Sequence, residues 1–253
     1  MKLSTISSLG LGALLLGLVQ TPAMSINIDL FNAPADGQQS IEIDGSQPLN
    51  YFVNNIFDGL DLNNTIGGKR EIQLTLIGRP EKNNNNGTKL TVNPTIIPKI
   101  SLSTDDELKS RATILWGRDS GSALGDLTDE GRDNSFELNV KSIDQPVTLN
   151  FFVKDTLGNE GTISNSISSS NNTSYFFKYS AANNVEFNSI QYVKLYTSNE
   201  PESLDLSFNS ITTAQAVPFE FSPGLGIVLS SGFFCFHALK KRWKNNSSDK
   251  LIS

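Results

Sequence analysis

Hydrophobic and polar residues alternate one by one along most of the chain. Runs such as Glu71–Leu76, Phe136–Val140 and Val147–Phe151 have an apolar residue at every second position. Successive side chains of a β-strand point to opposite faces, so each run has one apolar face for a core and one polar face for water. The same pattern predicts strands at Ile26–Leu30, Ile41–Ile43, Lys89–Val92, Ile96–Leu102, Ala112–Trp116, Thr162–Ile167, Tyr175–Lys178, Ile190–Tyr196 and Leu204–Phe208.

Short turn-forming stretches separate these runs, for example Asp58-Gly59, Gly67-Gly68 and Leu157-Gly158-Asn159. Between the two ends of the chain no segment shows a sustained helical period of ~3.6 residues. No repeat of about 20–50 residues is visible, which disfavours a propeller or a solenoid. The pattern predicts an all-β domain over residues 26–208, namely an antiparallel two-sheet β-sandwich of jelly-roll-like form.

The first 25 residues have the organisation of a secretory signal peptide. Lys2 supplies the positive charge, and Leu9–Val19 forms a short apolar segment. Ala23-Met24-Ser25 then places small residues at the positions that favour cleavage after Ser25, with cleavage after Ala23 as the second choice. The alternatives are an uncleaved anchor or a buried helix. We expect an exported protein whose mature chain begins at Ile26.

The other end of the chain has a spacer and then three parts in a fixed order: a short motif that contains Pro and Phe, an apolar segment and a basic cluster. Residues 209–216 are predicted to be an extended linker, and an apolar segment follows at Leu225–Leu239. We predict a C-terminal transmembrane helix over this segment. It would be about 22 Å long, against a hydrocarbon core of about 30 Å, which is short for a permanent anchor but adequate for a segment that is recognised at the membrane. A basic cluster follows it at Lys240, Lys241, Arg242 and Lys244, and places the tail at residues 245–253 in the cytoplasm.

This C-terminal order resembles the sorting signals of PEP-CTERM-class exosortase substrates. The motif here begins Val217-Pro218-Phe219-Glu220 and is similar to the PFE variant of cyanobacterial substrates. The resemblance implies a sorting signal at residues 217–244 and an exosortase-like membrane protease or transpeptidase as partner. It also implies an inner-membrane precursor, removal or replacement of Leu225–Lys244, and delivery to the cell surface or extracellular matrix. The alternative is a permanently membrane-anchored surface protein.

The sandwich region also resembles the β-rich ectodomains that are joined to such signals. This weaker likeness is carried by Ile66–Arg70, Ala112–Trp116, Gly125–Thr128 and Leu204–Ile211. It implies a fold class and no specific activity.

Composition excludes several function classes. The formal net charge is −6, and the basic cluster near the end makes the remainder more acidic still, which argues against nucleic-acid binding. The single Cys235 and the single His237 both lie in the apolar segment. The domain therefore has no disulfide, no Cys- or His-based nucleophile and no zinc site of Cys or His, and no cofactor motif is present. We predict a non-enzymatic protein.

Three other roles stay open at this point. A carboxylate-dependent glycoside hydrolase needs only two acids beside the scissile bond. The acidic loop before residue 134 offers weak calcium candidates in Asp126, Asp129 and Asp133, although a solvated turn is the favoured interpretation. Exopolysaccharide could stack on aromatic residues, but strand alternation assigns most of these to the core: Trp116, Tyr175, Phe176, Phe177, Tyr179 and Tyr192.

Overall fold

The computed structural model describes residues 25–32, 39–79, 87–93, 98–117, 123–168 and 170–216. Over these ranges the chain is all-β, with two short 3-10 helices, η1 (Ile66–Gly68) and η2 (Tyr179–Ala182). No helix within them is long and apolar enough to cross a membrane. The predicted signal peptide up to residue 24 and the predicted sorting signal, apolar segment and tail from Val217 onward lie outside the described residues.

One layer of the fold is a seven-stranded sheet, called sheet A below. Its order is β11-β8-β13-β6-β5-β2, and the short β1 pairs with β13. Its strands are β1 (Asn27–Asp29), β2 (Gln39–Asp44), β5 (Gly87–Asn93), β6 (Lys99–Thr104), β8 (Ser135–Ile143), β11 (Ser170–Lys178) and β13 (Leu206–Ala214).

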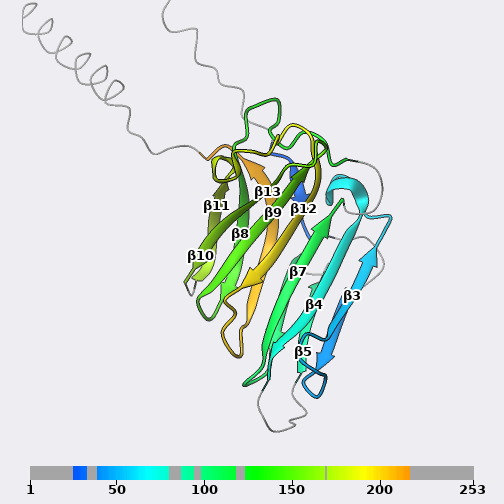
Figure 1. Ribbon diagram of the computed structural model, residues 1–253, viewed down its shortest axis with the longest axis vertical. Helices are drawn as coiled ribbons and strands as arrows, with labels where there is room; N and C mark the ends of the chain where they lie inside the picture. The colour runs from blue at the N-terminus through cyan, green and yellow to red at the C-terminus, as the bar shows by residue number, and fades with distance from the viewer. Residues whose placement is uncertain are drawn as a thin grey trace, which may run out of the picture. The chain divides into compact units, whose positions relative to one another are not determined.

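The second layer is a six-stranded sheet, called sheet B, with the order β10-β9-β12-β7-β4-β3. Figure 1 shows this sheet in front. Its strands are β3 (Phe52–Phe57), β4 (Arg70–Gly78), β7 (Lys109–Trp116), β9 (Val147–Asp155), β10 (Glu160–Ile167) and β12 (Ile190–Ser198).

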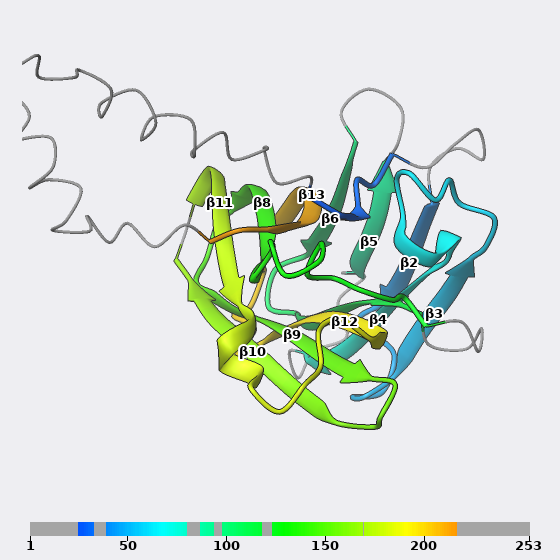
Figure 2. The same ribbon diagram turned by 90° about the horizontal axis from the view of Figure 1, so that it is seen from above.

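Every strand pair in both sheets is antiparallel, and the chain crosses repeatedly from one sheet to the other. From β6 to β9, for example, successive strands belong to sheets A, B, A and B. Figure 2 shows the two sheets face to face. The predicted fold class, an antiparallel, jelly-roll-like β-sandwich, is confirmed.

The core is formed by the alternate apolar residues that the two sheets turn toward each other. Phe136 of sheet A stacks on Phe151 of sheet B, with ring centroids 4.5 Å apart. Phe177 of β11 meets the same Phe151 ring edge-on at 4.8 Å. Trp116 is fully buried, at 0% exposure. Aromatic pairs in such geometries add to the free energy of burial, so they help to hold the layers together.

An ion pair is buried inside this core. Asp29 of β1 and Arg70 of β4 are both 0% exposed, and Arg70 Nη1 lies 2.7 and 2.6 Å from the two carboxylate oxygens of Asp29. Trp116 Nε1 donates to Asp29 Oδ2 at 2.9 Å, and Arg70 Nη2 donates to Gln39 Oε1 at 3.1 Å. The pair therefore joins sheet A to sheet B through charge-assisted hydrogen bonds.

One boundary prediction needs correction, and one strand was not predicted. Residues 209–214 do not belong to a linker, because β13 runs from Leu206 to Ala214 in the middle of sheet A. Ile211 and Thr213 are fully buried there, and the Thr213 hydroxyl is hydrogen-bonded. The polar residues of this segment indicated a linker, although they belong to a strand that packs in the core. The edge strand β3 was also not predicted, since Asn54-Asn55 interrupts its alternation.

Candidate functional site: the outer face of sheet B

The outer face of sheet B carries an unusual group of side chains in β9 and β12. Leu149, Phe151 and Val153 of β9 face the core, so Phe152 between them faces outward. In β12, Val193 and Leu195 face the core, which leaves Tyr192, Lys194 and Tyr196 outside. All four outward residues are half-buried. We call Phe152, Tyr192, Lys194 and Tyr196 the sheet B platform.

Register brings the members of the platform together. Phe152 is the cross-strand partner of Lys194, and the Phe152 and Tyr192 rings are stacked with centroids 5.7 Å apart and planes at 25°. Lys194 Nζ lies 4.8 Å from the centroid of the Phe152 ring and 5.0 Å from that of Tyr196. The ammonium group is thus held between two aromatic faces by cation–π attraction. The result is a continuous surface of three rings and one cation.

Hydrogen-bonding groups on β9, β10 and β12 flank the platform. Asn150, the cross-strand partner of Tyr196, accepts a hydrogen bond from Ser164 Oγ at 2.7 Å and donates to Ser198 Oγ at 2.7 Å. Ser164 is exposed, and Asn150 is 5% exposed. Asn150 therefore links the hydroxyl groups of Ser164 and Ser198 beside the rings.

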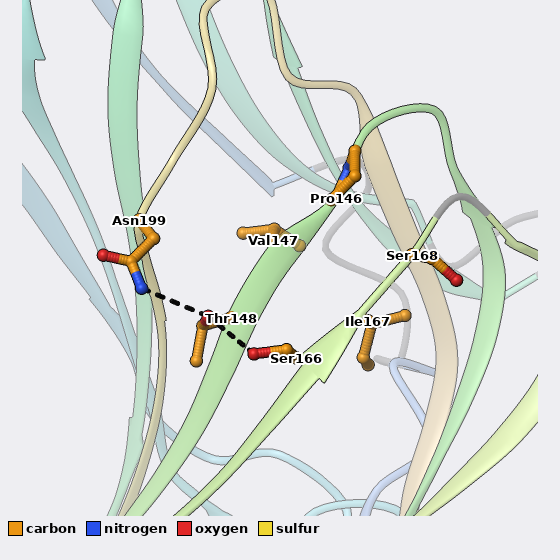
Figure 3. Close-up of a pocket in the computed structure, with 7 residues that line it drawn as sticks. All are labelled: Pro146, Val147, Thr148, Ser166, Ile167, Ser168 and Asn199. Carbon is orange, nitrogen blue, oxygen red and sulfur yellow. Dashed lines mark hydrogen bonds between the residues drawn. The ribbon is translucent and has the colours of Figure 1, made fainter.

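Further along the same strands the structure has a hollow of about 410 Å³. Figure 3 shows its lining, in which Asn199 Nδ2 donates to Thr148 Oγ1 at 3.3 Å and the Thr148 and Ser166 hydroxyls lie 3.2 Å apart. Thr148 is four residues before Phe152 in β9, about 13 Å at the usual rise of a strand. The hollow is lined by Pro146, Val147, Thr148, Ser166, Ile167, Ser168 and Asn199. Rings, amides and hydroxyls thus follow one another along β9.

The aromatic residues singled out from sequence divide between core and surface. Trp116, Phe177 and Tyr179 are buried, Tyr175 packs against the core, and Phe176 is 44% exposed on sheet A. Tyr192 is a member of the sheet B platform. Phe152 and Tyr196 were missed, although the alternation Tyr192-Val193-Lys194-Leu195-Tyr196 already places two rings and a cation on one face.

The acidic loop is held by hydrogen bonds of its own. Asp126 accepts from the backbone N–H of Thr128 at 2.7 Å and from that of Glu130 at 3.1 Å. Burial alone would raise the pKa of Asp126, but these bonds and one from the Thr128 hydroxyl outweigh it and lower the pKa. Asp129 Oδ1 pairs with Arg132 at 2.8 Å, and buried Asp133 accepts from the Thr213 hydroxyl.

Each of the calcium candidates Asp126, Asp129 and Asp133 thus has a structural hydrogen-bond or ion-pair partner. Among the described residues, no group of three His, Cys, Asp or Glu side chains could hold a metal ion. Ser25, the predicted cleavage position, is exposed at the start of the described chain, and the predicted sorting motif at Val217–Glu220 lies outside it.

A second hollow, on sheet A, is lined partly by acidic side chains. It has a volume of about 380 Å³ and is lined partly by Glu42, Asp44 and Asp105. Each acid already has a structural partner: Asp44 accepts from Ser46 N–H, Asp105 accepts from Gly87 N–H, and Glu42 pairs with Lys89 at 3.6 Å.

No protein-family model and no curated protein sequence matches the chain. Among solved structures, the family 11 carbohydrate-binding module of the cellulase Lic26A-Cel5E of Clostridium thermocellum is 9% identical, with a TM-score of 0.35, over 70% of this chain and 95% of that one. The family 30 module of the cellulase Cel9D-Cel44B from the same organism is 13% identical, with a TM-score of 0.36, over 71% and 99%.

PfGH50B is 11% identical, with a TM-score of 0.39; the match covers 60% of this chain and only 23% of the length of that protein. TM-scores this low do not establish a common topology. The β-sandwich assignment therefore rests on the strands and sheets of this chain itself.

Proposed function

We propose that this chain is an exported, non-catalytic β-sandwich protein that binds exopolysaccharide through the outer face of sheet B. The observation that carries the proposal is the sheet B platform, in which three half-buried aromatic rings lie on the side of the sheet that faces away from the core. A pyranose ring has an apolar C–H face and a rim of hydroxyl groups. Aromatic rings attract the C–H face, and amide and hydroxyl groups form hydrogen bonds with the hydroxyl rim.

The arrangement along the strands suits an extended ligand. The rings of β9 and β12, the Asn150 group and the hollow near Thr148 follow one another over about 13 Å, longer than one sugar ring. Few side chains need to be ordered on binding, because Asn150, Ser164 and Ser198 are already joined by hydrogen bonds. Such a preformed surface lowers the entropy cost of binding, and its length favours a polymer over a single sugar.

Binding can be tested with two substitutions and one matched control. Phe152→Ala and Tyr196→Ala remove rings from the platform, whereas Phe176→Ala removes an exposed ring of similar size from sheet A. In affinity electrophoresis against a panel of exopolysaccharides, we expect retardation of the wild type and of Phe176→Ala, and clearly reduced retardation of the other two. Absence of wild-type retardation on every polysaccharide, or equal losses in all three variants, would refute the proposal.

For delivery, we propose export by the signal peptide, with cleavage after Ser25, followed by handling of residues 217–244 by an exosortase-like protease or transpeptidase. The support is the three-part order of the C-terminal sequence. The precursor would lie in the inner membrane, and the product would lie at the cell surface or in the extracellular matrix. Mass spectrometry of the mature protein tests this: an intact end at Lys250–Ser253 would favour a permanent anchor and contradict processing.

A further inference from the structure

The first residue after the predicted cleavage position contacts a buried hydroxyl group. Ile26 N–H donates to Thr213 Oγ1 at 2.8 Å, and Thr213 N–H donates back to Ile26 O at 2.8 Å. Ile26 is half-buried, whereas Ser25 before it is exposed. Thr213 belongs to β13 and is 0% exposed. The nitrogen of Ile26 is therefore anchored to the sandwich, whereas the preceding Ser25 is exposed to solvent.

The same hydroxyl group donates to a buried carboxylate. Thr213 Oγ1 is hydrogen-bonded to Asp133 Oδ2, and Asp133 is 3% exposed. The other oxygen, Asp133 Oδ1, is buried and has no hydrogen-bond partner among the described residues. A buried carboxylate oxygen without a donor is costly, because it has lost its hydration and gained nothing in exchange.

The charges around Asp133 do not remove that cost. Burial raises the pKa of Asp133, and the neighbouring Asp129 raises it further, while the Thr213 hydroxyl and Arg132 lower it. Arg132 is already paired with Asp129 and with Glu130. The Tyr179 phenol is also near, but it donates to Leu127 O, and its own pKa is raised by burial and by Asp133 and Asp126. Among the described residues, Arg132 is the cation that acts on Asp133, and it is engaged with Asp129 and Glu130.

We propose that cleavage before Ile26 supplies a further positive charge: the new α-ammonium group of Ile26 forms an ion pair with Asp133 across the Thr213 hydroxyl. Hydrolysis of the Ser25–Ile26 bond gives the hydroxyl of water to the Ser25 carboxyl group and hydrogen to the Ile26 nitrogen, which is protonated at neutral pH. An amide nitrogen has one N–H, whereas an ammonium group has three. One bond to Thr213 can persist, and another donor becomes free for Asp133 Oδ1.

The consequence is a sandwich that becomes more stable when its leader is removed. Ile26 immediately precedes β1, which pairs with β13 and carries Asp29, the buried partner of Arg70. An ion pair at Ile26 therefore fixes the strand that holds the buried Asp29 in place. The inference rests on the proposed cleavage after Ser25, which is why the mature N-terminus has to be determined first.

The experiment begins with N-terminal sequencing of the exported protein. A start other than Ile26 would contradict the proposed cleavage and, with it, the ion pair in the natural protein. Independently, three forms of the chain to Ser253 are compared in detergent: one beginning at Ile26 with a free amino group, the same form N-acetylated, and one that retains Ser25. Acetylation removes the charge while leaving all side chains in place.

At pH 7 we expect the melting temperature of the free Ile26 form to exceed those of the other two by about 2–4 °C. A partner carboxylate raises the pKa of the amino group above its unfolded value of about 7.7–8.0, so the stabilisation is present below that value. It disappears as the pH rises through the raised pKa in the folded state. At pH values above that, the free and acetylated forms should melt together.

Asp133→Asn supplies the decisive control, because it should abolish the difference between the free and acetylated forms. If that variant does not fold, the pKa of the Ile26 amino group, measured by NMR in the wild type, gives a second readout and should lie above about 8. Equal melting temperatures at pH 7, a difference that survives Asp133→Asn, or an amino-group pKa that is not raised would each overturn the ion pair. None of these outcomes bears on polysaccharide binding.

Discussion

The buried pair of Asp29 and Arg70 gives the sharpest prediction about stability. In Arg70→Met the side-chain volume is nearly kept, but the Asp29 carboxylate loses the guanidinium that lies 2.6 Å from Oδ2. Asp29 would keep the N–H groups of Trp116 and Phe31 as donors, at 2.9 and 2.8 Å. An uncompensated buried charge typically costs about 3–5 kcal/mol, a large part of the roughly 5–15 kcal/mol that stabilises a domain.

The neighbouring residue provides a matched control. Lys69 forms an ion pair with Asp58 at 3.3 Å, but that carboxylate is largely exposed, and such surface pairs are worth about 0–1 kcal/mol. Guanidinium chloride unfolding of the wild type, Arg70→Met and Lys69→Ala measures both effects. We expect the midpoint of Arg70→Met to fall by about 1 M, and that of Lys69→Ala to change little.

A double substitution separates charge pairing from packing. Asp29→Ala alone should also be costly, since it leaves the Arg70 guanidinium buried without its counter-ion. The combination Asp29→Ala with Arg70→Met should lose clearly less than the sum of the two single losses, because neither charge is then stranded. The reasoning fails if Arg70→Met costs no more than Lys69→Ala, or if the two single losses simply add.

Three further predictions concern binding, acid stability and packing. Loss of either ring in Phe152→Ala or Tyr196→Ala should weaken polysaccharide binding about tenfold by titration calorimetry, and an unchanged affinity would contradict stacking. Burial opposes ionisation of Asp155, but hydrogen bonds from Glu186, Asn159 and Leu157 hold its pKa below the usual 3.8. Ionised Asp155 thus stabilises the fold above pH 3.8, and this contribution disappears as the pH falls through the lowered pKa. Asp155→Asn should flatten the acid side of the curve of stability against pH. An unchanged curve would refute this role of Asp155. A Cβ atom on Gly161 would lie 2.6 Å from Ala182 Cβ, so Gly161→Ala should lower the free energy of unfolding by about 1–3 kcal/mol. An unchanged melting temperature would show that η2 can shift to make room at little cost.

Strand positions were readable from the sequence because they depend on local alternation. The run Val147–Phe151 lies within β9, and Ile190–Tyr196 lies within β12. Alternation did not reveal a strand where polar residues occupy successive positions, as Asn54 and Asn55 do in β3. It also failed where threonine occupies a buried position, as Thr213 does in β13. In those strands the hydroxyl and amide groups form specific bonds that composition does not reveal.

The sequence indicates which residues of the candidate site share a face of their strand, but not which of them are in contact. Alternation alone turns Tyr192, Lys194 and Tyr196 outward, yet only the pairing of β9 with β12 brings Phe152 beside Lys194. In the same way, Ile26, Asp133 and Thr213 are distant along the chain and meet only through the pairing of β1 with β13 and the loop before β8.

From sequence alone, then, follow the all-β class, the approximate strand positions and the absence of a histidine or cysteine from the domain, because each depends on neighbouring residues or on composition. Which strands pair, which carboxylates are buried and which rings lie side by side are properties of the folded chain. They depend on register between segments far apart in sequence, where a shift of one residue turns every side chain of a strand to the opposite face. The buried Asp29, the sheet B platform and the site around Asp133 all arise at that level.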